Sequence, residues 1–197
     1  MIKLLYQGHG SLRLSAETAV IYIDPYAGKG YDIPADLILV THGHQDHNKT
    51  ELPVKKPGCK IITYKDAVFM KGNEIGYHTF VLYGMKITAV PAYNKNHSRE
   101  SSVGYILDTG GLRLYFAGDT SRTEEMSVMK DIDYAFLPID GIYNMNASEA
   151  AKCAGLIGAK YAVPVHMVPG KLFDRAAAEK FNAPNRLIIE AGEERIL

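Results

Sequence analysis

Short apolar runs separated by turn residues fill the first two thirds of the chain. Strands are expected at residues 2–6, 11–14, 19–23, 37–40 and 60–64, and hairpins that turn near glycines at 79–91 and 103–117. Further strands are expected at 134–139, 161–165, 186–190 and 194–197. Helices are expected after Thr123 or Ser121, over 149–157 and from Asp174 to Phe181, and Asp66 is expected to cap a helical turn over 67–71.

The order of these elements predicts an α/β (α+β) fold. The first half is mostly strands and hairpins, whereas the second half alternates strands and helices, and no linker or break in composition separates the two. A chain of 197 residues of which 47% are apolar is long enough to bury a core without disulfides. We therefore expect one domain, residues 1–197, with two packed sheets and helices outside them.

Charge and cysteine content exclude several classes of protein. Lys plus Arg and Asp plus Glu are both 22, so the sequence offers no basic tract for nucleic acid. The two cysteines, Cys59 and Cys153, lie far apart and indicate reduced thiols, with Cys153 in the core. The N-terminus is too quickly polar for a signal peptide, and no run approaches the length of a membrane span. A soluble, cytoplasmic protein is expected, with no membrane partner.

The most informative stretch is Thr41-His42-Gly43-His44-Gln45-Asp46-His47, directly after the apolar run 37–40. Alternate side chains of an extended segment point the same way, so His42 and His44 can share one ion. Gly43 allows a tight turn, which displaces Asp46 and His47 toward a second ion beside the first. A loop of merely solvated histidines is the alternative, but four potential ligands within six residues favour a metal site.

Four other residues with metal-binding or acid–base chemistry lie just beyond strand-like runs. Asp24, Asp119 and His166 each follow such a run, and His97 lies in the polar loop 94–102 between the two hairpins. Strand ends in packed sheets can meet at one edge, so all four can converge on the histidine cluster.

These motifs resemble those of the metallo-β-lactamase superfamily, whose fold is a four-layer αββα sandwich with a metal site at one edge of its two sheets. The resemblance covers nearly the whole chain. It rests on the HxHxDH motif at residues 42–47, on Ile23-Asp24-Pro25, on Ala117-Gly118-Asp119-Thr120 and on Val163-Pro164-Val165-His166. The short length and phrases such as Phe136-Leu137-Pro138-Ile139 are similar to the uncharacterised metal-dependent hydrolase branch related to ascorbate 6-phosphate lactonase.

The resemblance implies two divalent ions. His42, His44 and His97 would hold the first, Asp46, His47 and His166 the second, and Asp119 would bridge them. Chemistry supports this division, because a carboxylate has two oxygens and can span two ions, whereas an imidazole has one metal-facing nitrogen. Nitrogen and oxygen ligands without a thiolate favour zinc and also suit manganese or iron.

The hypothetical mechanism is hydrolysis by a water that the two metals activate, with Asp46 and Asp119 as catalytic carboxylates. Asp24 is expected to accept a hydrogen bond from a ligand histidine and fix its tautomer, the alternative being an exposed turn acid. His9, in the turn Gly8-His9-Gly10, either approaches the site without binding metal or is satisfied by hydrogen bonds within its turn.

Several assignments stay open in the sequence. His78 is the rival of His97 for the third histidine of the first ion, and His97 is favoured because it lies in the loop between the hairpins. Tyr93, Asn94, Arg99 and Tyr143 lie in loops expected to border the metal edge, where each either binds substrate or is only solvated.

The expected function is a lactonase-like, metal-dependent hydrolase that acts on a small-molecule ester, lactone or phosphoester. One alternative is a phosphodiesterase or nuclease acting on nucleotides or RNA, since a two-metal site also serves phosphoryl transfer. Another is a non-catalytic metal-binding or sensor protein. A small molecule is the expected partner, nucleic acid is not, and a homo-oligomer is left open.

Overall fold

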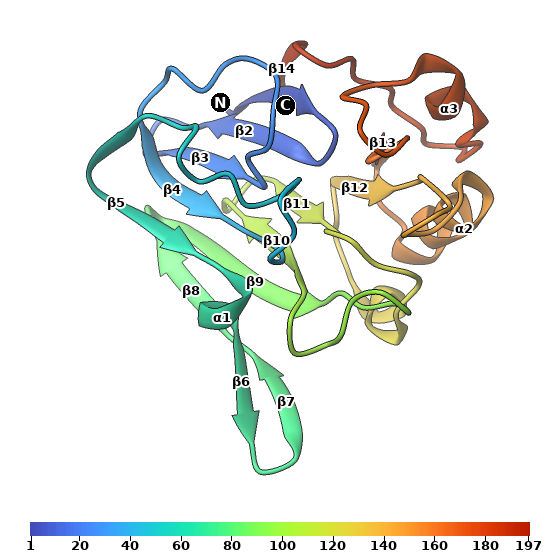
Figure 1. Ribbon diagram of the computed structural model, residues 1–197, viewed down its shortest axis with the longest axis horizontal. Helices are drawn as coiled ribbons and strands as arrows, with labels where there is room; N and C mark the ends of the chain where they lie inside the picture. Colours follow the sequence, from blue (N-terminus) through green and yellow to red (C-terminus); the bar gives the residue numbers. More distant parts are fainter.

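The computed structural model describes residues 1–197 and contains two six-stranded sheets that share one core (Figure 1). The first sheet has the strand order β14-β1-β2-β3-β4-β5 and the second the order β13-β12-β11-β10-β9-β8. The strands of the first sheet are β1 (Lys3–Gly8), β2 (Ser11–Ser15), β3 (Val20–Ile23), β4 (Ala35–Leu39), β5 (Lys55–Ile62) and β14 (Glu194–Ile196). Those of the second are β8 (Thr79–Leu82), β9 (Met85–Pro91), β10 (Val103–Asp108), β11 (Arg113–Phe116), β12 (Tyr134–Pro138) and β13 (Tyr161–Val165).

Each sheet changes from antiparallel to parallel pairing along its width. In the first sheet β1, β2 and β3 pair antiparallel, whereas β3, β4 and β5 are parallel. In the second, β8 to β11 are antiparallel, whereas β11, β12 and β13 are parallel. Parallel neighbours start at the same end, so β4, β11, β12 and β13 can each deliver a loop to the edge where their carboxyl ends lie.

Alternating side chains divide each strand between the core and an outer face. In β3, Ile21 and Ile23 join the main core of 43 buried residues, whereas Tyr22 between them points to the other face. The neighbouring strand β4 repeats this pattern, with Leu37 in the main core and Ile38 on the outer face. The period of two is that of a pleated strand, and it places the core between the two sheets.

Two helices pack beside the second sheet (Figure 1). Helix α2 (Ala147–Ile157) begins at a capping box in which Asn146 and Glu149 satisfy each other's backbone N–H groups, and it ends at Gly158. Its buried face, which includes Cys153 as predicted, lies against β12. Helix α3 (Arg175–Lys180), capped by Asp174, contacts α2. No helix in the structure combines the length and apolar character needed to cross a bilayer.

The predicted α/β sandwich is confirmed, with one difference in its outer layers. The outer face of the first sheet, which includes Tyr22 and Ile38, is covered by Tyr31 from the loop between β3 and β4 instead of by a helix. This loop is interrupted by Pro25 and Pro34, which disfavour a continuous helix.

Two predictions for residues 63–71 are wrong. Thr63, not Asp66, caps the helix α1 (Tyr64–Ala67), and residues 68–71 form strand β6 (Val68–Lys71) instead of a helical turn. Strand β6 pairs with β7 (Glu74–Tyr77) in a hairpin that projects from the body (Figure 1), because the Gly72-Asn73 turn suits a two-residue hairpin loop.

Residues 186–190 do not form the predicted strand, and they make a single isolated bridge, between Ala162 and Arg186. The following turn at Gly192 redirects the chain to β14, so the segment leaves β13 after one contact. The segment after Thr123 is a short 3-10 helix, Glu124–Val128, with Met126 buried.

Candidate metal centre

The predicted site residues lie together at the edge of the two sheets, each delivered by a turn or loop next to a strand. The loop after β4 carries four of them, and single residues come from the loops after β9, β11 and β13 and from the β1–β2 turn. An isolated bridge between His42 and Ser102 ties the loop after β4 to the second sheet. Gly118 permits a close approach here, because a Cβ at this position would lie 2.9 Å from the Thr41 side chain.

Three non-glycine residues at this edge have left-handed backbones. The φ angles are +58° at His9, +46° at Asp24 and +45° at His166. Such a conformation is unfavourable for residues with a side chain and persists only where surrounding contacts hold it. One of those contacts joins two of the three, because the His166 N–H donates to the His9 carbonyl at 2.8 Å.

The predicted first ligand set is assembled in the structure. One ring nitrogen from each of His42, His44 and His97 lies within 4.8 Å of the others. His97 Nε2 is 3.2 Å from His44 Nδ1. Three imidazole nitrogens that converge at this spacing form a group able to hold a divalent ion.

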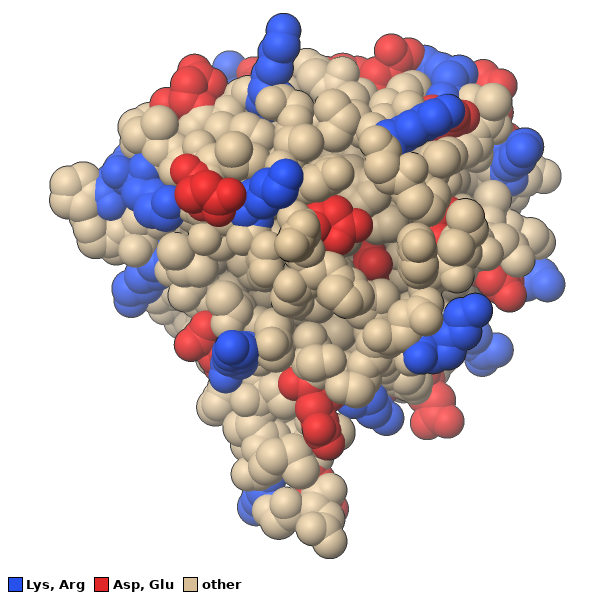
Figure 2. All heavy atoms as spheres, in the orientation of Figure 1, with Lys and Arg blue, Asp and Glu red and all other residues tan.

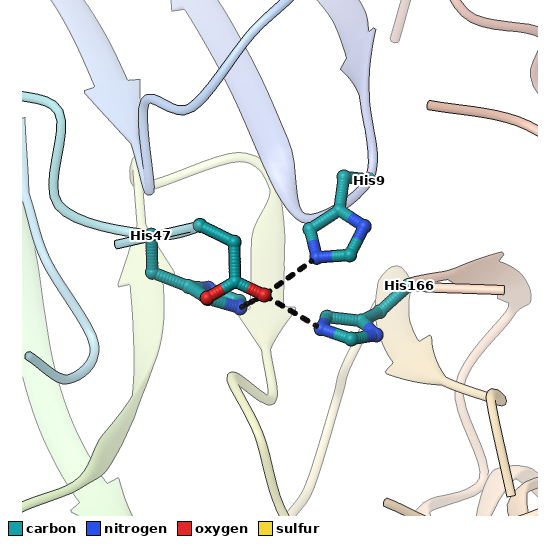
Figure 3. A group of neighbouring side chains, drawn as sticks. His9, His47 and His166 are labelled. Carbon is teal, nitrogen blue, oxygen red and sulfur yellow. Dashed lines mark hydrogen bonds and ion pairs between the residues drawn. The ribbon is translucent and has the colours of Figure 1, made fainter. Parts of the chain in front are cut away.

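The predicted second set, Asp46, His47 and His166, lies beside the first. Asp46 Oδ2 is 3.6 Å from His166 Nε2 and 3.9 Å from His47 Nε2. Figure 3 shows that His9 and His166 both point at this carboxylate, and His9 Nε2 is 3.1 Å from Asp46 Oδ2. His9 therefore contacts Asp46 directly instead of being satisfied within its own turn.

Asp119 lies between the two sets and turns one oxygen toward each. Its Oδ1 is 3.4 Å from His47 Nε2 and 3.6 Å from His166 Nε2. Its Oδ2 is 3.6 Å from His97 Nε2 and 3.9 Å from His42 Nε2. This is the arrangement that a bridging carboxylate requires.

Hydrogen bonds to Nδ1 fix the orientation and the protonated nitrogen of the His42 and His47 rings. The carboxylate of Asp24 accepts from His47 Nδ1 at 2.8 Å. Thr41 Oγ1 donates to Asp24 at 2.7 Å, so its lone pair accepts from His42 Nδ1 at 3.0 Å. When Nδ1 carries the proton, Nε2 of a neutral imidazole presents its lone pair, and here both Nε2 atoms face the centre of the cluster.

Four of the inward-facing atoms have no hydrogen-bond partner. His42 Nε2, His47 Nε2, His166 Nε2 and Asp119 Oδ1 are all buried and unpaired. Buried polar atoms are almost always paired in proteins, so a group of them around one point indicates a missing partner. Because the nitrogens offer lone pairs and the oxygens are anionic, the partner that fits them is a cation.

The electrostatics of the cluster also favour added positive charge. Burial raises the pKa of Asp119, but the neighbouring His47 and His166 outweigh it and hold that pKa far below its ordinary value. Burial lowers the pKa of His166, and Asp119 outweighs it and raises that pKa overall. Burial lowers the pKa of His42 to about 2, with His47 adding to the effect. The carboxylate is therefore ionised and is balanced by protons that a metal ion can replace.

His97 and not His78 belongs to the assembled cluster. The His78 ring packs between Phe69 and Phe80, at centroid distances of 4.5 and 6.1 Å. We expect His97→Ala to lower the bound metal per chain, because it removes a nitrogen of the first set, whereas His78→Ala leaves it unchanged. Elemental analysis of both purified variants tests this, and equal metal content in the His97 variant and the wild type would contradict it.

Three of the four candidate substrate contacts already have partners within the protein, and the fourth, Tyr143, is half exposed. The Arg99 guanidinium lies 4.6 Å from the centre of the Tyr93 ring and pairs with Glu125, so both side chains already have protein partners. Asn94 accepts from His97 Nδ1 at 2.9 Å, which assigns its amide to holding that ring. Tyr143 is half exposed on the turn after β12.

Asp140 is the site residue that the sequence analysis missed. Its buried Oδ2 lies 3.1 Å from His166 Nδ1, and its Oδ1 accepts the backbone N–H groups of Ile142 and Tyr143, both at 2.7 Å. Burial raises its pKa, but the contacts with His166 and with these N–H groups outweigh it and bring the pKa to about 2. Asp140 follows the run 134–139 as Asp119 follows 113–117, so the signal was an acid just beyond a strand.

Two packed sheets with a histidine and aspartate cluster at one edge are the arrangement of the metallo-β-lactamase fold. The sequence model of the beta-lactamase superfamily domain matches residues 3–166, and the chain belongs to this superfamily. It is similar to two proteins named as metal-dependent hydrolases. One, from Thermococcus onnurineus, is 32% identical, and the other, from Thermococcus kodakarensis, is 30% identical, each alignment covering 84% of both chains.

Solved structures agree with this placement. A metal-dependent hydrolase from Parabacteroides distasonis is 31% identical, with a TM-score of 0.78 over 95% of this chain and 91% of that one. Igni18, a metallo hydrolase from Ignicoccus hospitalis, shares the fold, with 23% identity and a TM-score of 0.74 over 98% and 97% of the two chains.

Proposed function

We propose that this protein hydrolyses a small-molecule ester or lactone with two metal ions bound at the centre. The observation that carries the proposal is the position of Asp119, with Oδ1 toward His47 and His166 and Oδ2 toward His42 and His97. The relationship to ascorbate 6-phosphate lactonase belongs to the same proposal, as the branch that the sequence motifs resemble.

His42, His44 and His97 would hold one ion, Asp46, His47 and His166 the other, and Asp119 both. When bound, the ions supply Lewis acidity and a water whose pKa is lowered toward about 7. The nitrogen and oxygen donors fit zinc first and manganese or iron as alternatives. Asp24, Thr41, Asn94 and Asp140 keep the histidine rings in the orientation that exposes their lone pairs.

Asp46 is the carboxylate best placed to accept a proton during the reaction. Its side chain is 37% exposed, whereas that of Asp119 is 5% exposed, so Asp46 alone of the two borders solvent. His9 Nε2 contacts the same oxygen and can share that proton. We assign His9 as a partner of Asp46, although one of its ring nitrogens also lies within 4.8 Å of the ligand atoms of Asp46, His47 and His166.

The surroundings of the site favour a small, uncharged substrate. Ile142 and Tyr143 are 57% and 50% exposed on a turn that Asp140 holds beside His166. We take this exposed apolar pair as a candidate contact for an acyl group or a lactone ring. On the face drawn in Figure 2, charged side chains of both signs are interspersed without a broad basic area, which does not favour a nucleic-acid substrate.

A substrate panel with zinc-loaded protein tests the proposal. We expect hydrolysis of aryl esters and lactones, with kcat/KM rising from acetyl to butyryl esters, and slower turnover of phosphomonoesters and phosphodiesters. Faster turnover of phosphodiesters would favour a phosphodiesterase instead. Metal-loaded protein without activity on any member would favour a binding or sensor protein.

A further inference from the structure

One continuous chain of contacts joins the two candidate ligand sets behind the metal centre. His97 Nδ1 lies 2.9 Å from Asn94 Oδ1, and Asn94 Nδ2 donates to Asn144 Oδ1 at 3.2 Å. Asn144 Nδ2 in turn donates to Asp140 Oδ2 at 2.7 Å, and the same oxygen lies 3.1 Å from His166 Nδ1. The chain begins at a ligand of the first set and ends at a ligand of the second.

The direction of every amide in this chain is fixed by its neighbours. Asn94 Oδ1 also accepts the backbone N–H groups of Asn96 and His97, at 2.8 and 3.1 Å, so it must be the oxygen and His97 Nδ1 must donate. At the other end, the Asp140 carboxylate can only accept, so Asn144 presents its NH₂ group there and its oxygen to Asn94. His97 thus keeps Nδ1 protonated and Nε2 free, and at the other end Asp140 faces His166 Nδ1 with an oxygen that can only accept.

Asn144 is the central link, although it touches none of the candidate ligands. It is buried, with 9% of its surface exposed, and its side chain bonds only to Asn94 on one side and Asp140 on the other. Its backbone N–H adds a bond to Asp140 Oδ1 at 3.3 Å. The residue thereby connects the loop that carries His97 to the carboxylate that faces His166.

We propose that Asn144 is a positioning residue that holds both ligand sets in register, so that its loss weakens the binding of both ions. The proposal rests on the two-ion centre proposed above. Its physical basis is that a ligand ring binds metal well only when its other nitrogen has a fixed partner. Asn144 bonds to Asn94, the partner of His97, and to Asp140, the partner of His166.

The test is Co²⁺ titration of Asn144→Leu, which keeps the side-chain volume and removes both amide groups. We expect the affinity to fall about tenfold in each of two binding steps, within the range for partners of metal ligands, and the visible absorption of bound Co²⁺ to change. Asn144→Ala carries the same expectation and replaces the leucine variant if that one does not fold.

Asn96→Leu is the matched control. The Asn96 side chain donates to the Tyr143 carbonyl at 3.1 Å, so it bonds to the same turn but is not a link in the chain of contacts. The variant keeps the backbone N–H that bonds to Asn94, and its Co²⁺ affinity should stay within about twofold of wild type. Wild-type affinity in the Asn144 variants, or a loss in one step only, would overturn the positioning role. A wild-type protein that binds a single Co²⁺ would instead contradict the two-ion centre itself.

Discussion

Asp119→Ala is expected to remove hydrolysis and to reduce bound zinc from two ions per chain to one or none. The carboxylate is the one group with an oxygen toward each ligand set, and its side chain is only 5% exposed, so no solvent-exposed group can take its place. The loss of kcat/KM should exceed about 10²-fold, the upper range for residues that only support a metal ligand. Steady-state kinetics and elemental analysis of the same preparation measure both effects.

Asp119→Asn separates shape from charge, because the amide keeps the volume but cannot donate two anionic oxygens to two ions. It should resemble the alanine variant in metal content. Asp108→Ala is the control: this carboxylate also lies at the end of a strand but pairs with Arg113 at 3.6 Å. Two zinc ions and wild-type turnover in Asp119→Ala would show that the ions do not share this residue.

Removing the metal with a chelator should abolish activity and lower the melting temperature together. A ligand present at 100 times its Kd stabilises the folded state by about 2.7 kcal/mol. In a domain of this size that corresponds to a shift of about 5–10 °C. The melting temperature should fall on chelation because buried histidine nitrogens and an Asp119 oxygen in the cluster have no partner until a cation is present.

Differential scanning calorimetry with and without the chelator, followed by zinc readdition, measures this shift. Asp119→Ala should show a smaller shift in melting temperature than the wild type, because it binds one ion or none. If chelation removed activity but left the melting temperature of the wild type unchanged, the ions would not be held by residues that the fold has buried.

The sequence contained enough information to predict which histidines and aspartates come together, because each lies in a turn or loop next to a strand. The period-two pattern of β3 and β4 locates the core face, and the polar residues that end the neighbouring strands then meet at one edge. His97 was harder, since it lies in a long loop. Its place between the hairpins favoured it over His78, and the structure confirms the choice, because the His78 ring packs on Phe69 and Phe80.

Apart from the bond between Asp24 and His47, the supporting contacts could not be predicted from the sequence. Asn144 bonds to Asn94, and Asp140 faces His166. Each pair joins segments that lie far apart in the chain, and no local pattern indicates such pairing. Distant contacts also explain why the strand predicted at 186–190 does not form. Its apolar residues predict a strand, but a strand forms only if the segment stays beside β13 for several residues. It makes one bridge there and then turns toward β14.

The left-handed backbones of His9, Asp24 and His166 make these three positions unusual targets for mutation. Glycine or asparagine would suit the backbone better than the native residue yet would remove a side chain that the centre uses, whereas valine would disturb both. At these three positions the backbone conformation favours glycine or asparagine, whereas the metal centre needs the native side chain. In a screen for the thermal stability of the metal-free protein, we expect glycine or asparagine at His9 and His166 to be enriched, and the enriched proteins to be inactive.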